Sequence, residues 1–200
     1  MSEERQIQAA ALAGVLDSIE RVAGEKGRNL VLRHAGLEHY IGNPPSTEDD
    51  AWLPVAHYRS VNRGIRQAFG DKGSRPLLIY AGEELIHGGL TGVSASAFSI
   101  AMRLMPGLLR RKAAFKIVSS AIVQITGVPP KIVEEKGKFT LHYYNCPYCE
   151  GTQSDEPICY YDVGIMKALA EWGTGKPQKV TEIECAAVGA EACVFEIAEV

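Results

Sequence analysis

All five cysteines of this 200-residue chain lie between positions 146 and 193. Cys146 and Cys149 form a Cys-x-x-Cys motif, whose two-residue gap lets a tight turn direct both thiolates at one tetrahedral ion. Cys159, Cys185 and Cys193 follow. Each cysteine alone is consistent with a small buried side chain, but the five together favour metal ligation by four of them. Four thiolates close the coordination shell of a structural zinc ion, and an iron–sulfur cluster is the alternative because it uses the same ligands.

Two other uses of the cysteines are disfavoured. The chain begins with the acidic, polar sequence MSEERQ and lacks the basic start and apolar run of a secretory signal, so we expect a cytoplasmic protein. A disulfide framework is not expected in that compartment, and the odd number of cysteines argues against it. Redox catalysis by the Cys-x-x-Cys motif requires a following helix, whereas here an acidic loop over residues 150–156 follows it.

Two alternating runs near the C-terminus, 179–186 and 192–198, predict a hairpin folded about Gly189. The expected register places facing residues in three pairs: Cys185 with Cys193, Ile183 with Phe195, and Thr181 with Ile197. This register turns the acidic side chains of both strands to the outer face: Glu182, Glu184 and Glu196. The two hairpin cysteines then lie close enough to bind one ion, and a slip of one residue would separate them.

The segments before this hairpin are mostly helical. Apolar periodicity predicts helices over 3–23, 29–40, 53–69, 75–87, 94–105 and 108–125, most of them ended by glycine or proline. A second hairpin is expected over 131–134 and 138–144, and a helix over 157–172. Cys159 lies near the start of that helix, where the positive end of the helix dipole favours a thiolate.

The composition limits the classes of function. With 46% hydrophobic and 22% charged residues, the chain can bury one sizeable core. Its longest apolar stretches are interrupted before they reach the length of a bilayer, so no membrane span is expected. A formal net charge of −3 argues against nucleic acid as a partner, because neutralising phosphates requires a basic surface.

The residues from Pro157 to Ile197 resemble the 4-vinyl reductase domain family. The similarity rests on the segments CYYDVG at 159–164, EIECAAVG at 182–189 and CVFEI at 193–197. This family includes the protein of bacteriochlorophyll synthesis that names it and the aromatic-sensing input domains of phenol-responsive transcription activators. We expect an N-terminal helical segment over 1–45 and a domain of this family over 46–200.

The resemblance implies an α/β (α+β) fold, with helices packed on a small antiparallel sheet, similar to nitric oxide sensors and to a component of vesicle-tethering complexes. It also implies zinc ligation by Cys159, Cys185 and Cys193, with an upstream glutamate as fourth ligand in the phenol sensors. In that upstream region this chain offers Cys146 and Cys149, beside Glu134, Glu135 and Glu150. We take Cys149 as the first candidate for the fourth ligand.

The resemblance further implies a small apolar or aromatic ligand and a homodimer. If a cavity exists, the apolar faces of 77–90 and 94–105 are the expected walls. They supply four candidate pocket residues: Tyr80, His87, Phe98 and Met102. Ordinary core packing explains each of them equally well.

No catalytic constellation, phosphate loop or dinucleotide fingerprint appears in a suitable context. The sequence therefore favours a zinc-stabilised protein that binds a small hydrophobic molecule, such as a hydrocarbon, an aromatic or a tetrapyrrole, as sensor or carrier. One alternative is an enzyme or accessory factor in tetrapyrrole vinyl reduction. The other is a dimeric interaction module without a ligand.

Overall fold

The computed structural model describes residues 5–46, 51–90, 106–135 and 138–200. The first half consists of these elements: β1 (Gln6–Gln8), α1 (Ala9–Ala35), a 3-10 turn (Glu38–Tyr40), β2 (Trp52–Pro54) and α2 (Val55–Leu90). The second half consists of α4 (Gly107–Thr126), β3 (Lys131–Glu135), β4 (Lys138–Tyr143), α5 (Tyr160–Thr174), β5 (Gln178–Glu184), a 3-10 turn (Ala186–Val188) and β6 (Cys193–Glu199). The predicted helix over 94–105 falls outside the described residues.

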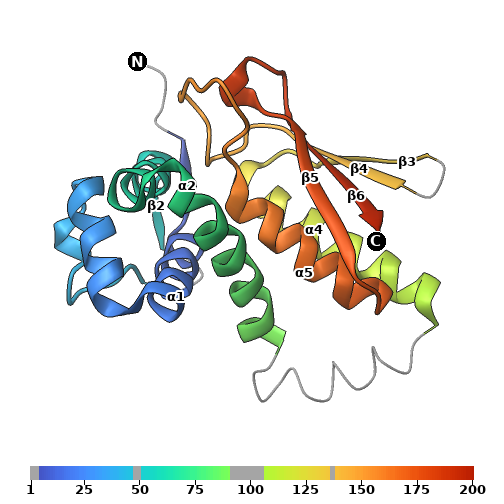
Figure 1. The fold of residues 1–200 in the computed structure, drawn as a ribbon, viewed down its shortest axis with the longest axis horizontal. Coiled ribbons are helices and arrows are strands. Elements are labelled where there is room, and N and C mark those ends of the chain that lie inside the picture. The colour runs from blue at the N-terminus through green and yellow to red at the C-terminus, as the bar shows by residue number, and fades with distance from the viewer. Residues whose placement is uncertain (1–4, 47–50, 91–105, 136–137) are drawn as a thin grey trace.

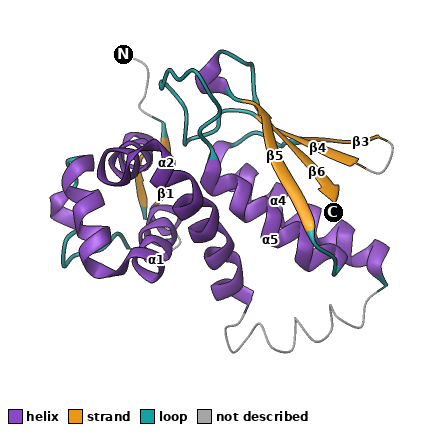
Figure 2. Cartoon of the chain, viewed as in Figure 1, coloured by secondary structure: helices purple, strands orange, loops and turns teal. Residues whose placement is uncertain are grey.

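One antiparallel sheet dominates the C-terminal half of the chain. Its strand order is β3-β4-β6-β5, and a separate two-stranded ribbon pairs β1 with β2. Helices α4 and α5 lie along one face of the sheet, and α2 and α1 lie beyond α5 (Figures 1 and 2). This arrangement confirms the predicted α+β class, with helices packed on a small antiparallel sheet.

Glycines divide the two long N-terminal helices. Gly24 in α1 has φ of 71° and Gly70 in α2 has φ of 69°, a left-handed conformation that other residues rarely adopt. Each helix therefore changes direction at its glycine. The sequence predicts helix ends at residues 23 and 69, and the breaks occur at the next residue in each case.

Helices α2 and α5 cross at very short distance because each has a glycine at the contact. A Cβ atom at Gly82 would overlap the carbonyl oxygen of Tyr161, and one at Gly164 would overlap the carbonyl oxygen of Ile79. Only glycine allows two helix backbones to approach this closely. This crossing sets the position of the first turn of α5, which Cys159 directly precedes.

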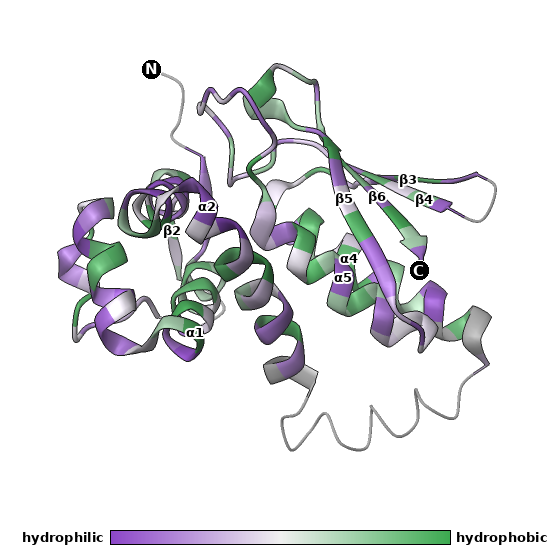
Figure 3. Ribbon diagram, viewed as in Figure 1, coloured by the Kyte–Doolittle hydropathy of each residue, from purple (hydrophilic) through white to green (hydrophobic). Residues whose placement is uncertain are grey.

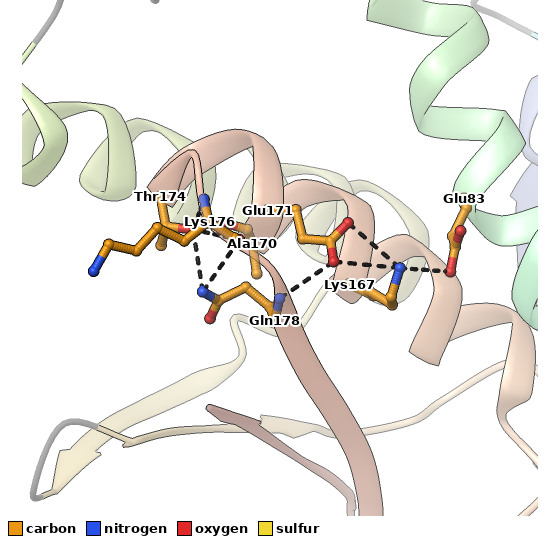
Figure 4. Close-up of polar contacts among 7 residues, drawn as sticks. All are labelled: Glu83, Lys167, Ala170, Glu171, Thr174, Lys176 and Gln178. Atoms are coloured by element: carbon orange, nitrogen blue, oxygen red, sulfur yellow. Dashed lines mark hydrogen bonds and ion pairs between the residues drawn. The ribbon is translucent and has the colours of Figure 1, made fainter. Parts of the chain in front are cut away.

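Polar contacts attach α5 to both of its neighbours (Figure 4). Lys167 Nζ lies 3.0 Å from a carboxylate oxygen of Glu83 on α2 and 3.3 Å from one of Glu171 within α5. Glu171 in turn accepts a hydrogen bond from the backbone N–H of Gln178 at 3.2 Å, at the start of β5. The helix is thus held against α2 on one side and against the sheet on the other.

The hydrophobic core runs through the whole described chain, from Ile7 at the N-terminus to Phe195 on β6. Hydrophobic residues are prominent along α4 and β6 (Figure 3). Burial of this apolar surface is the main stabilising contribution. Among the described residues, no helix has the length and apolar character needed to cross a membrane.

Candidate metal centre and apolar cavity

Four segments bring the five cysteines together. Cys146 and Cys149 lie in the turn after β4, Cys159 is the residue before α5, Cys185 follows β5, and Cys193 begins β6. All five side chains are buried, and none is more than 2% exposed. The buried cluster has the composition of a metal site, because its ligands are soft sulfur atoms shielded from water.

The distances between the sulfur atoms fit tetrahedral coordination. Cys159 Sγ lies 3.6 Å from that of Cys193 and 3.9 Å from that of Cys185, and the sulfurs of Cys185 and Cys193 are also 3.9 Å apart. Cys146 Sγ is 3.6 Å from that of Cys159, and Cys149 Sγ is 3.3 Å from that of Cys193. A zinc–sulfur bond of about 2.3 Å gives a tetrahedron edge of about 3.8 Å.

The register of the β5–β6 pair differs from the predicted one. Val180 faces Ile197 and Glu182 faces Phe195, so the predicted Thr181–Ile197 and Ile183–Phe195 pairs are wrong. A β-bulge at Ile183 then shifts the register by one residue, and Cys185 and Cys193 approach each other as predicted. The bulge turns both Ile183 and Glu184 outward, where they are exposed.

Glu182 is a site residue that the sequence reasoning missed. It was predicted on the outer face, but it is only 7% exposed. Its Oε2 accepts a hydrogen bond from the backbone N–H of Cys159 at 2.8 Å. Its Oε1 is buried and has no hydrogen-bond partner among the described residues, so it is available as a metal ligand. An acid three residues before a ligating cysteine is the signal that was available.

Two carboxyl groups are buried beside the sulfurs, and their environment is short of positive charge. Burial raises the pKa of Asp162 to about 8 and that of Glu182 to about 9, and neighbouring cysteines contribute to both increases. Cys146 Sγ donates to Asp162 Oδ2 at 3.6 Å. A divalent cation supplies the missing charge, because it favours the ionised form of every ligand around it.

The donor set therefore fits a metal ion. Two overlapping groups of four have all ligand atoms within 4.8 Å of one another: Cys146, Cys149, Cys159 and Cys193, and Cys159, Glu182, Cys185 and Cys193. The predicted ligands thus lie together, and Cys159 and Cys193 belong to both groups. The cluster can hold a metal ion.

Aromatic and polar contacts fix the Cys-x-x-Cys turn on α2. The ring of Tyr148 lies between those of Tyr58 and Tyr161, with centroid distances of 4.7 and 5.4 Å. Asn62 donates a hydrogen bond to the carbonyl oxygen of Tyr148 at 3.2 Å, and Arg59 donates one to that of Glu150 at 3.1 Å. The position of the turn is therefore set by packing against α2 as well as by its cysteines.

An apolar cavity lies between α4, α5 and the sheet, away from the cysteines. Its volume is about 30 Å³, which is room for about one water molecule. Its main apolar lining residues are Ala114, Phe115 and Val118 from α4, Phe139 from β4, and Met166 and Leu169 from α5. Arg111 contributes a charged group, with its guanidinium carbon 4.7 Å from the centre of the Phe139 ring.

The residues predicted to form a pocket lie elsewhere. Tyr80 is 53% exposed on α2, and the side chain of His87, 55% exposed, lies beside Glu84. Phe98 and Met102 lie outside the described residues. The cavity lining that the structure shows combines residues far apart in the sequence, which no local pattern identifies.

Solved structures with the same fold include H-NOX proteins. One from S. oneidensis, in an Fe(II)NO ligation state, aligns with a TM-score of 0.58 at 12% identity and covers 94% of this chain and 98% of that chain. A mutant H-NOX from T. Tengcongensis aligns with a TM-score of 0.61 at 12% identity, covering 96% and 97%. At this identity the similarity establishes the fold alone.

The phenol-responsive sensory domain of the transcription activator PoxR, solved with phenol, shares the fold as well. It aligns with a TM-score of 0.53 at 16% identity over 74% of this chain and 75% of that chain. The family is defined by the C-terminal part, because residues 139–199 match the family model of the vinyl-4-reductase domain. The resemblance seen in the sequence is confirmed over these residues.

An uncharacterized protein of Methanocaldococcus jannaschii is 38% identical over 65 residues. The match covers 32% of this chain and 36% of that protein. The chain therefore spans about a third of the length of the curated relative that it matches. The family and the fold together define a small-molecule-binding or sensory type of domain.

Proposed function

We propose that this chain is a zinc-stabilised binding module for a small apolar or aromatic molecule. The observation that carries the proposal is the apolar cavity between α4, α5 and the sheet. Concave apolar sites with a few polar groups at their edge are the usual form of a ligand site. Arg111 provides such a group, since its side chain is 32% exposed and its guanidinium lies 3.6 Å from Glu134.

The size of the cavity favours a ligand of few atoms. A volume of about 30 Å³ excludes a tetrapyrrole and requires side chains to move even for one aromatic ring. Met166 is suited to such movement, because its side chain is unbranched and adaptable. The PoxR domain responds to phenol, and a phenol here would place its ring among apolar side chains and its hydroxyl near Arg111.

The metal in this proposal is zinc, held at the cysteine cluster, and its role is structural. Thiolate ligands buried from water leave no position for a reacting molecule. The cluster instead connects four segments of chain at the end of the sheet. Zinc gives a colourless protein, whereas an iron–sulfur cluster absorbs visible light, so metal analysis with an absorption spectrum distinguishes the two.

Ligand binding is tested by narrowing the cavity. Native mass spectrometry of the purified protein, followed by thermal shift with phenol, naphthalene and a short alkane, should reveal one stabilising ligand class. Ala114→Leu fills the cavity and should abolish that shift. Ala121→Leu, on an exposed position of the same helix, should preserve it. A wild-type protein that neither carries nor binds any apolar molecule would contradict the proposal.

One observation favours a second candidate, a homodimer formed through α4. Leu109 and Ile117 are 51% and 37% exposed, and with Ala113 and Ala121 they repeat every four residues along one side of the helix. Such a stripe buries apolar surface if a second copy packs against it. Light scattering should give twice the monomer mass, and Ile117→Glu should convert the dimer to monomer without loss of ligand binding.

A further inference from the structure

We propose that the cysteine cluster is a binuclear site, in which two divalent metal ions share the thiolates of Cys159 and Cys193. This inference rests on the metal binding proposed above and extends it to the number of ions and the role of each ligand. A single tetrahedral ion takes four ligands, but six buried groups meet here: the five cysteines and Glu182.

The six groups divide into two sets of four with two members in common. Cys146 and Cys149 complete one set and Glu182 and Cys185 complete the other, while Cys159 and Cys193 belong to both. Two tetrahedra that share one edge have this composition. The shared edge is the line between the sulfurs of Cys159 and Cys193, which are 3.6 Å apart.

The outer ligands lie at tetrahedral distances from the shared edge. On one side, Cys146 Sγ is 3.6 Å from that of Cys159, and Cys149 Sγ is 3.3 Å from that of Cys193. On the other side, Cys185 Sγ is 3.9 Å from both shared sulfurs. All these values are near the edge of about 3.8 Å expected for zinc–thiolate bonds. Five sulfurs at such separations exceed what one ion binds.

Glu182 supplies the second observation. Its Oε2 is occupied by the N–H of Cys159, but its Oε1 is buried without a partner among the described residues. Leaving a buried carboxylate oxygen unpaired is costly. An ion bound by Cys159, Cys185 and Cys193 would give Oε1 a ligand bond, whereas an ion held only by Cys146, Cys149, Cys159 and Cys193 would leave it unpaired.

Charge balance also favours two ions. Two divalent ions offset four of the six ligand charges, whereas one ion offsets only two and leaves a larger buried negative charge. The start of α5, at Cys159, adds the partial positive charge of a helix N-terminus at a shared ligand. The arrangement thus resolves the excess of acidic groups without removing any of them from the site.

Metal stoichiometry tests the proposal directly. The protein purified with zinc and passed through a desalting column should contain two zinc ions per chain by mass spectrometry of the elements. The double variant C146S/C149S should keep one, and so should E182Q/C185S, because each retains one complete half with the shared edge. Glu184→Gln, at an exposed neighbouring position, serves as control and should keep two.

Cadmium-113 NMR gives a readout that does not depend on total metal. The cadmium-loaded wild type should give two signals of equal area, and each double variant should give one. One zinc ion and one cadmium signal in the wild type would overturn the binuclear site and leave a single structural ion. A wild type without bound metal would overturn both proposals. Circular dichroism identifies any variant that loses metal because it does not fold.

Discussion

The carboxylate of Glu182 accepts a hydrogen bond from the backbone N–H of Cys159, with 2.8 Å between the two heavy atoms. This contact joins the end of β5 to the first turn of α5 at the centre of the cysteine cluster. It exists because the bulge at Ile183 follows Glu182 and leaves that side chain on the buried face. The strand therefore supplies both an apolar surface and a metal-facing carboxylate.

Replacing Glu182 by glutamine should weaken metal binding while preserving the fold. The amide side chain would still accept the hydrogen bond from Cys159 but would bring no charge. We expect a loss in zinc affinity of about 10–100-fold, as for other groups that support a metal site. Competition with a chromophoric chelator measures it, with Glu184→Gln as the matched control. Equal affinities for both variants would mean that Glu182 has no part in the site.

Removing the metal should loosen the end of the sheet more than the N-terminal helices. The segments 144–159 and 185–193 carry the cysteines, whereas α1 and α2 pack through an apolar core. A ligand present at about 1,000 times its dissociation constant stabilises the folded state by about 4 kcal/mol, so chelation should lower the melting temperature. Hydrogen exchange should rise first in the cysteine-bearing segments. Uniform exchange across the chain would contradict this assignment.

The metal-free protein should become less stable as pH rises. Burial raises the pKa of Asp162 to about 8 and that of Glu182 to about 9, so the folded state keeps protons that the unfolded carboxyls lose near about pH 4. Their contribution to stability is complete below about pH 4 and is lost as pH rises through about 8 and 9. Zinc affinity should change oppositely, because ligands bind as they deprotonate.

Urea unfolding between about pH 5 and 9 measures this dependence, with chelator and with zinc. The free energy of unfolding of the metal-free protein should fall over this range. The double variant Asp162→Asn with Glu182→Gln should show a flatter curve, since neither side chain then titrates. A metal-free wild type that is most stable at the alkaline end would show that these carboxyls are ionised in the folded state.

The crossing of α2 and α5 should not tolerate a methyl group. In Gly82→Ala the new Cβ meets the backbone of Tyr161, which cannot move without displacing α5, so we expect a loss of about 3 kcal/mol or more. Gly73→Ala is the control in the same helix, where the Cβ would lie 3.5 Å from Phe69. It should be neutral or stabilising by up to about 1 kcal/mol. Chemical denaturation compares the two.

Local patterns were sufficient for the features that depend on neighbouring residues. The ends of the first and third predicted helices coincide with Gly24 and Gly70, because a left-handed glycine interrupts a helix whatever surrounds it. The candidate metal ligands were also accessible, since cysteines in a Cys-x-x-Cys turn and in paired strands have few other uses together. The segment that resembles 4-vinyl reductase domains was recognisable for the same reason.

Features that depend on packing between distant segments required the tertiary structure. A period of two cannot show a bulge, because the bulge places two successive residues, Ile183 and Glu184, on the same side. That shift decided the orientation of Glu182. The apolar cavity is likewise formed by α4, α5 and the sheet together, and its shape depends on how closely those elements approach. The sequence by itself determined which residue types can bind metal, and the packing of the chain decided which of them meet.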